Sequence, residues 1–234
     1  MTDTLDLGID DLPAGDGDNV TDWCLGQFCE HYGDSSITKD DIWEYLYGVM
    51  HAPDWRKKYK HDLQRNLPRV PFAPDFEPFR AAGRELMDLH IGYDEVPEHP
   101  VDCLVDGEVD NDGAADPTAD PDAYRITKLA WGKGADKKAE RSVLEVNARC
   151  RLVGIPDAAH DYTISGRSPL QWAIDHLRHK HDKKSGITDD PNAWEVWADE
   201  PYNLIRHLRR LIRVSVESAR IISELPPSLD GEGT

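Results

Sequence analysis

The stretch GRSPLQWAIDHLRHKHDKKSGITDDPNAW, residues 166–194, joins a well-capped helix to a charged turn. Ser168 can cap the helix, Pro169 suits its first position, and Gln171 lies three residues after the cap, which predicts a capping box. Apolar side chains then recur at helical spacing, which predicts one face packed on a core: Leu170, Ala173, Ile174 and Leu177. We expect this helix to span residues 168–180.

The segment that follows the helix is densely basic and then acidic, which admits a metal site, a nucleic-acid contact or a solvated loop. His176 and His179 share a helical face and could chelate zinc, with His181 nearby. No carboxylate or thiolate stands at a recognisable spacing as a further ligand, and the adjacent lysines and arginine oppose a dication. We therefore predict neither a metal nor a cofactor.

Charge is distributed unevenly along the chain of 234 residues, whose net charge is -18. Residues 1–22 contain seven Asp, residues 94–122 contain eleven Asp or Glu, and neither segment contains Lys or Arg. These two segments account for the whole net charge, so the rest of the chain is balanced. A local basic surface can bind phosphate despite overall acidity.

The N-terminal part has the pattern of helices from about residue 21 to 93. Thr38 with Asp41 predicts a second capping box, and the same helix places apolar residues on one face: Ile42, Tyr45, Leu46 and Val49. Pro53 suits the start of a further helix. Four prolines within residues 68–78 predict a loop, and residues 79–93 predict another helix.

The second half alternates between strand and helix signals. Residues 94–123 are acidic and rich in Pro and Gly, which predicts a loop insertion. Residues 124–131 alternate like a strand, residues 132–141 form a basic turn, and residues 142–155 predict one or two more strands. A long helix is expected at 201–225. The sequence predicts an α+β fold with an N-terminal helical region, a small central antiparallel or mixed sheet and C-terminal helices.

No catalytic motif is present: the sequence lacks a P-loop, a GxSxG elbow and an HExxH motif. Three basic elements remain as candidates for DNA contact: the hairpin expected at 125–141, the turn at 178–184, and a strip on the outer face of the last helix formed by Arg206, Arg209, Arg210 and Arg213. Lys and Arg contact phosphates, and Arg or Asn can contact base edges in a groove. Each element alone is also compatible with a solvated surface.

The stretch ITKDDIWEYLYGVMHAPDWRKKYKHDLQRNLPRVPF, residues 37–72, resembles the start of the C-terminal specificity domain of Type ISP restriction-modification enzymes. The resemblance continues through residues 79–96, 154–192 and 202–226, with GRSPLQW followed by DKKSGITDDPN as its most specific part. It covers about residues 19–226. The acidic leader and the acidic stretch at 94–122 depart from the family pattern.

The resemblance implies a target recognition domain of a phage-defence restriction-modification system. In that family one polypeptide joins a nuclease, an ATP-driven translocase and an adenine-N6 methyltransferase to this domain, which selects the DNA sequence. We therefore expect a non-catalytic partner of double-stranded DNA that works with a methyltransferase and translocase portion in cis or in trans. The expected DNA-contacting residues are Arg125, Lys128, Lys133, Lys137, Lys138, Arg141, Asn147, Lys183, Lys184 and Ser185.

Two other functions stay open from the residues. The basic faces would also suit a module that docks onto a separate motor-methyltransferase subunit, and the acidic segments would suit a DNA mimic. Residues 1–18 and 227–234 are expected to be disordered flanks of one domain at 19–226. Without an apolar run of membrane-spanning length or a signal peptide, we expect a cytoplasmic protein with no membrane contact. A monomer is the default expectation for its oligomeric state.

Overall fold

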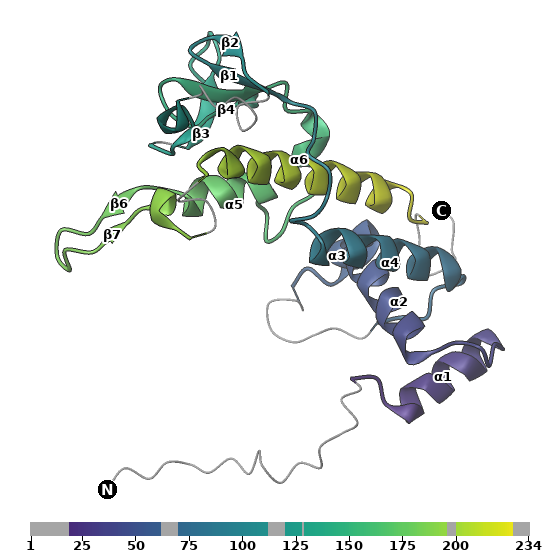
Figure 1. Ribbon diagram of the computed structural model, residues 1–234. Helices are drawn as coiled ribbons and strands as arrows, with labels where there is room; N and C mark the ends of the chain where they lie inside the picture. The colour runs from purple at the N-terminus through teal and green to yellow at the C-terminus, as the bar shows by residue number, and fades with distance from the viewer. Residues whose placement is uncertain (1–18, 62–69, 112–119, 128, 196–199, 227–234) are drawn as a thin grey trace, which may run out of the picture. The chain divides into compact units, whose positions relative to one another are not determined.

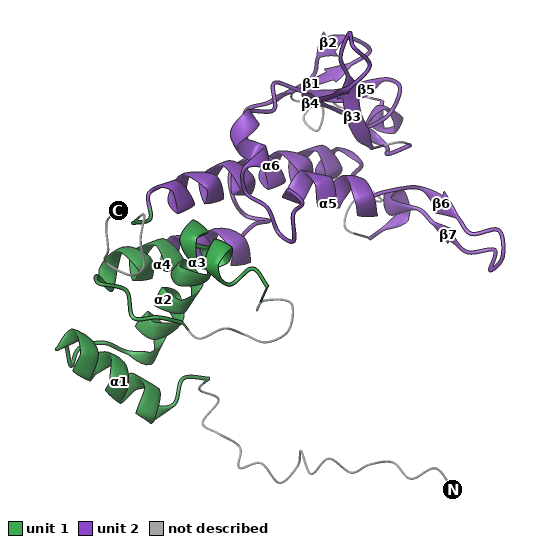
Figure 2. Cartoon of the chain, turned by 180° about the vertical axis from the view of Figure 1, so that it is seen from behind, with its two compact units in different colours: residues 1–84, 225–234 green, residues 85–224 purple. Residues whose placement is uncertain are grey.

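The computed structural model describes residues 19–61, 70–111, 120–127, 129–195 and 200–226 (Figure 1). The chain divides into two compact units (Figure 2). Unit 1 comprises Met1–Arg84 with Leu225–Thr234, and unit 2 comprises Glu85–Glu224. Unit 2 is thus inserted in sequence within unit 1, where the sequence favours one domain over residues 19–226. The expected disordered flanks, 1–18 and 227–234, lie outside the described residues.

Unit 1 is helical, as the sequence predicts. It contains α1 (Asp22–Tyr32), α2 (Lys39–His51), α3 (Pro53–Lys58) and the first part of α4 (Glu77–Ile91). The Thr38 capping box at the start of α2 is confirmed, because the hydroxyl of Thr38 accepts from the Asp41 amide while the Asp41 carboxylate accepts from the Thr38 amide. Aromatic and aliphatic side chains form the core, including Phe28, Tyr45 and Trp55.

Helices α2 and α4 contact each other through two glycines. A Cβ atom at Gly48 would lie 2.0 Å from the carbonyl oxygen of Phe79, and one at Gly83 would lie 1.8 Å from the carbonyl oxygen of Glu44. Both positions leave no room for a methyl group, so the two backbones approach as closely as glycine allows. Beside this contact, Arg80 and Arg84 pair with the buried Glu44 at 2.8 and 3.0 Å.

Unit 2 is built on a five-stranded antiparallel sheet with the strand order β2-β1-β5-β4-β3. Its strands are β1 (Asp102–Val105), β2 (Glu108–Val109), β3 (Ala130–Lys133), β4 (Ala139–Glu145) and β5 (Cys150–Val153). The register pairs Leu144 of β4 with Leu152 of β5, and both side chains are fully buried. The pairing of β3 with β4 shifts between Trp131 and Gly132.

The helices of unit 2 complete its core. The α-helices are the C-terminal part of α4, α5 (Pro169–His176) and α6 (Tyr202–Ser223), with 3-10 turns at η3 (Pro121–Tyr124), η4 (Asp157–His160) and η5 (Pro191–Ala193). Leu170 and Ile174 of α5 and Ile205 and Leu208 of α6 pack in one cluster with the sheet. A separate two-stranded hairpin consists of β6 (Lys180–His181) and β7 (Thr188–Asp189).

The α+β prediction is confirmed, and three local differences stand out. Residues 94–123, expected as a loop, contain β1, β2 and most of η3, because Val101, Cys103 and Ala123 supply buried apolar side chains between the acidic residues. The strand expected at 124–131 begins only at Ala130. Helix α5 ends at His176, and the basic segment after it forms the β6–β7 hairpin rather than another helical turn.

The capping box expected at the start of α5 is half formed. The Ser168 hydroxyl accepts from the Gln171 amide at 3.3 Å, as expected. The Gln171 side chain does not complete the box, because its oxygen accepts from Trp131 Nε1 of β3 at 2.8 Å and its nitrogen donates to Asp175. Gln171 therefore connects α5 to the edge strand of the sheet.

Candidate nucleic-acid interface

The turn between β3 and β4 presents a cluster of exposed basic side chains: Lys133, Lys137, Lys138 and Arg141. The backbone closes through a hydrogen bond from the Gly134 amide to the Lys138 carbonyl at 3.0 Å, and Lys137 adopts a left-handed φ of 63°. Asp136 accepts from the Lys138 amide and pairs with its ammonium at 3.3 Å. The turn is thus held by its own backbone and Asp136, which leaves its other cations directed to solvent.

Arg141 is positioned by an aromatic side chain. Its guanidinium lies 5.7 Å from the ring centroid of Trp131, a cation–π contact across β3 and β4. Trp131 is itself fixed by its hydrogen bond to Gln171. A planar guanidinium held in this way keeps its donors available for a phosphate or a base edge.

Arg125 and Asn147 lie at a loop junction beside η3. The Asn147 side-chain nitrogen donates to the carbonyls of Ala123 and Arg125 at 2.7 and 2.8 Å, and its oxygen accepts from the amides of Arg149 and Cys150 at 2.7 Å each. Asn147 therefore holds two loops together, and its expected contact with a base stays a prediction. Arg125 is half-buried and pairs with the exposed Asp122 at 2.7 Å. Lys128 lies outside the described residues.

The β6–β7 hairpin carries the second set of expected residues: Lys183, Lys184 and Ser185. All three are exposed. The Asp182 carboxylate accepts from the amides of Lys184 and Ser185 at 2.8 and 2.9 Å, and these hydrogen bonds hold the pKa of Asp182 below its ordinary value. The Ser185 hydroxyl accepts from the Ile187 amide at 3.3 Å. This turn therefore presents the two ammonium groups on a fixed backbone.

The prediction of a basic strip on the outer face of α6 is wrong for Arg209, at the centre of the strip. Arg209 is buried, and its guanidinium donates to the Val101 carbonyl at 2.9 Å and to the Asn111 side chain at 2.5 Å. It also contacts Tyr202 Oη at 3.0 Å and Glu98 at 3.3 Å. The sequence held a signal for this, because Tyr202, Ile205, Arg209 and Ile212 recur at helical spacing on the buried face.

Two of the remaining arginines of that strip pair with carboxylates. Arg206 pairs with Glu98 at 3.7 Å, and Arg213 pairs with Glu217 at 3.4 Å. The acidic segment also forms ion pairs of its own, since Arg149 pairs with Asp106 at 2.8 Å and Asp120 at 2.6 Å. Sequence reasoning missed the pairs of Arg206 and Arg149 because their partners are far apart in the chain. The two hairpins are left as the stronger basic surfaces.

Histidines of α5 and the hairpin make local contacts. His176 Nδ1 lies 2.8 Å from the Trp172 carbonyl, and His181 Nδ1 lies 2.9 Å from Thr188 Oγ1. Within the described ranges, no group of three or more His, Cys, Asp or Glu side chains is arranged to hold a metal ion. None of the helices in those ranges has the length and apolarity needed to cross a membrane.

The fold described above is shared with known proteins. The model of the Type ISP C-terminal specificity domain matches residues 8–207. The chain belongs to this family. Among curated proteins, none matches the chain.

Three solved structures similar to this specificity domain contain much longer chains. The cryo-EM structure of a DrdV–DNA complex matches with a TM-score of 0.73 and 35% identity over 90% of this chain. The ATP-dependent Type ISP restriction-modification enzyme LlaBIII bound to DNA matches with a TM-score of 0.67 and 30% identity over 82% of this chain. A nuclease-deletion mutant of the Type ISP restriction-modification enzyme LlaGI, in complex with a DNA substrate mimic, matches with a TM-score of 0.66 and 32% identity over 81% of this chain. The chain corresponds to 20%, 11% and 14% of those three chains, respectively.

Proposed function

We propose that this specificity domain recognises a target sequence in double-stranded DNA for a Type ISP restriction-modification system and has no catalytic activity of its own. The observation that carries the proposal is the pair of exposed basic hairpins in a fold shared with enzymes bound to DNA. A domain without its own nuclease, motor or methyltransferase motifs needs those activities from a larger region, in cis or in trans.

The proposed contacts fall into two groups. Lys133, Lys137, Lys138, Lys183 and Lys184, with the Ser185 hydroxyl, would contact the phosphates of the backbone. Phosphate contacts fix the position of a protein on the duplex, whereas contacts with base edges select the sequence. Arg125, Lys128 and Arg141 are the proposed base contacts, because Arg and Lys pair with the acceptors of guanine in the major groove. Asn147 would act by positioning Arg125 through its carbonyl hydrogen bond.

The experiment is selection of this chain on a randomised duplex pool at low and near-physiological salt, followed by sequencing. We expect one enriched motif, lost in the Arg125→Ala and Lys128→Ala variants and retained in Lys57→Gln, which removes an exposed charge from α3 in unit 1. Retention of no duplex at either salt would contradict the proposal for the isolated chain.

A groove favours a second function, docking onto the motor-methyltransferase region. It lies over α5 and α6, has a volume of about 1040 Å³, and is lined by Ile164, Trp172, Trp194, Arg210 and Leu211 among others. Exposed aromatic and aliphatic side chains beside an arginine are typical of the centre of a protein interface. Binding to the separately produced remainder of a Type ISP enzyme, lost in Trp172→Ala, would support this role.

A further inference from the structure

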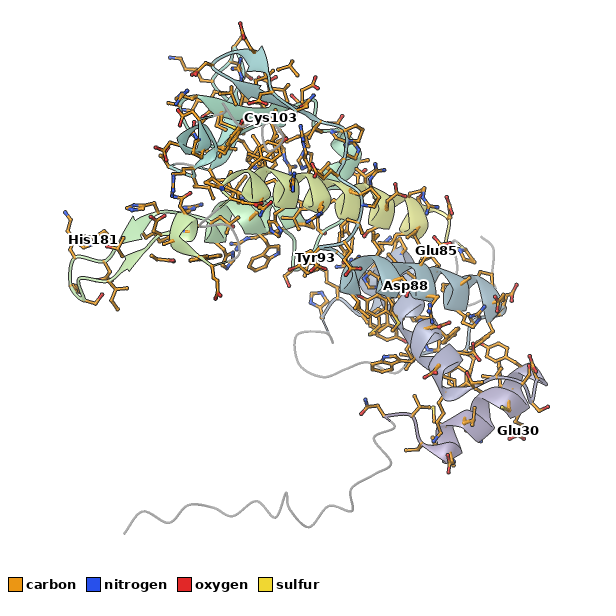
Figure 3. The ribbon with its side chains drawn as sticks, viewed as in Figure 1. Glu30, Glu85, Asp88, Tyr93, Cys103 and His181 are labelled. Atoms are coloured by element: carbon orange, nitrogen blue, oxygen red, sulfur yellow. The ribbon has the colours of Figure 1, made fainter. Side chains whose placement is uncertain are left out.

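The side chains of the β6–β7 hairpin are exposed to solvent and contribute little to the core of unit 2. Residues 178–189 are all exposed, and the hairpin extends away from the rest of unit 2 in both views (Figures 1 and 2). Figure 3 places His181 on this extension, far from Cys103 in the sheet. Because an isolated two-stranded hairpin is marginally stable in water, packing does not explain why the chain forms one here.

The tip of the hairpin nevertheless contains a set of backbone and side-chain hydrogen bonds. The Asp182 amide donates to the Ile187 carbonyl at 2.9 Å, and the Gly186 amide donates to the Asp182 carbonyl at 2.8 Å. Gly186 adopts a left-handed φ of 73°, which glycine tolerates best. With the Asp182 carboxylate bonds to Lys184 and Ser185, these contacts fix the backbone on both sides of Ile187.

The two faces of the hairpin differ. His181 and Thr188 are paired across the strands and their side chains touch at 2.9 Å, so they share one face. Side chains alternate along a strand, so Lys180, its cross-strand partner Asp189 and Ile187 belong to the opposite face. Ile187 is 66% exposed, an apolar side chain on an otherwise polar hairpin. In the described part of the chain, Lys180, Lys183 and Lys184 have no ion-pair partner.

Resting on the DNA recognition proposed above, we propose that the β6–β7 hairpin enters the major groove of duplex DNA and that Ile187 contacts the 5-methyl group of a thymine. The major groove, about 12 Å wide, admits a two-stranded β-ribbon, and apolar side chains contact the thymine methyl there. Isoleucine is stiff at χ1, so a fixed backbone holds its methyl groups in a defined position. Lys183 and Lys184 contact the phosphates beside the groove.

The minor groove is the alternative that the geometry disfavours. It is about 6 Å wide and displays no thymine methyl group. An apolar side chain that enters it acts as a wedge between base steps and bends the duplex. The two grooves therefore predict different responses to removal of one methyl group from the DNA.

The experiment replaces each thymine of the selected duplex, one at a time, by deoxyuridine, which lacks only the 5-methyl group. The dissociation constant is measured for the wild-type chain, for Ile187→Ala and for Val109→Ala, a control at an apolar β2 position that is 61% exposed. We expect one deoxyuridine position to weaken the wild type and Val109→Ala about fourfold, the value of one buried methyl-sized group. Ile187→Ala should bind both duplexes equally.

Each result decides between the proposals. If wild-type binding is strong but no deoxyuridine position matters, or if Ile187→Ala responds like the wild type, the thymine contact is overturned while DNA recognition stands. DNA bending that requires Ile187, without a deoxyuridine effect, would assign the hairpin to the minor groove instead. Failure of the wild-type chain to bind any duplex overturns DNA recognition itself. Thermal unfolding of both variants checks that the fold is intact.

Discussion

Arg209 shows how one buried charge connects distant parts of unit 2. The residue is 6% exposed on α6, yet its donors are used by groups from residues 98–111 and by Tyr202. Tyr202 in turn donates to the Asn111 carbonyl at 2.6 Å. The network joins the acidic segment to the long helix, so that segment is part of the folded core at this point.

Replacing Arg209 with alanine is expected to lower the free energy of unfolding by about 3 kcal/mol, because the buried Val101 carbonyl loses its donor and the Asn111 and Glu98 side chains lose their cation. Arg206→Ala, one turn earlier on α6, is the control and should cost under about 1 kcal/mol, since Arg206 is more exposed and its ion pair is screened. Urea unfolding of both variants measures the difference. Equal losses would contradict a structural role for Arg209.

At the scale of elements, the contact of α2 with α4 depends on glycine. Gly83→Ala would place a methyl group 1.8 Å from the Glu44 carbonyl oxygen, and we expect a loss of about 3 kcal/mol as the helices separate. Gly26→Ala, in the interior of α1 with nothing within 4 Å, should gain about 0.5 to 1 kcal/mol from helix propensity. Opposite shifts in unfolding midpoint are the expected result.

Helices of this chain could be predicted from sequence because their signals are local. Thr38, Pro53 and Ser168 each stand at the start of the helix that they predict. The strands β1 and β2 could not be predicted from the sequence because they are short and lie among acidic residues. Strand β1 forms through its pairing with β5, a segment distant in the chain, and not through a local sequence pattern. The helix expected to end at residue 180 ends at His176, because Lys180 pairs with another segment as part of strand β6.

The candidate site could be predicted in part. Exposed lysines in short turns are recognisable from composition, and the structure does place Lys133, Lys137, Lys183 and Lys184 at hairpin tips. The roles of Asn147 and Arg209 could not be predicted from composition. The same residue types occur as polar groups bonded inside a fold and as polar groups that face a ligand. Only the three-dimensional partners of their donors and acceptors separate the two cases.

For the whole molecule, local charge rather than net charge should control DNA binding. A chain with a net charge of -18 is repelled by DNA at long range, yet its binding releases DNA counterions only where its cations meet phosphates, and this release makes the affinity depend on salt. For the Lys183→Gln, Lys184→Gln double variant, we expect the slope of log K against log salt to become shallower by about 2. Lys57→Gln should leave the slope unchanged, and equal slopes in all three proteins would contradict phosphate contacts at the hairpin.

The inserted arrangement of unit 2 constrains the order of events during translation. Leu225 is a member of the unit 1 core together with Phe28, Tyr45 and Trp55, but the ribosome adds it after all of residues 85–224. At about 5–20 residues per second, that interval is on the order of 10 s. The core of unit 1 therefore lacks Leu225 during this interval, whereas all of unit 2 has been synthesised before Leu225 is added and has time to fold first.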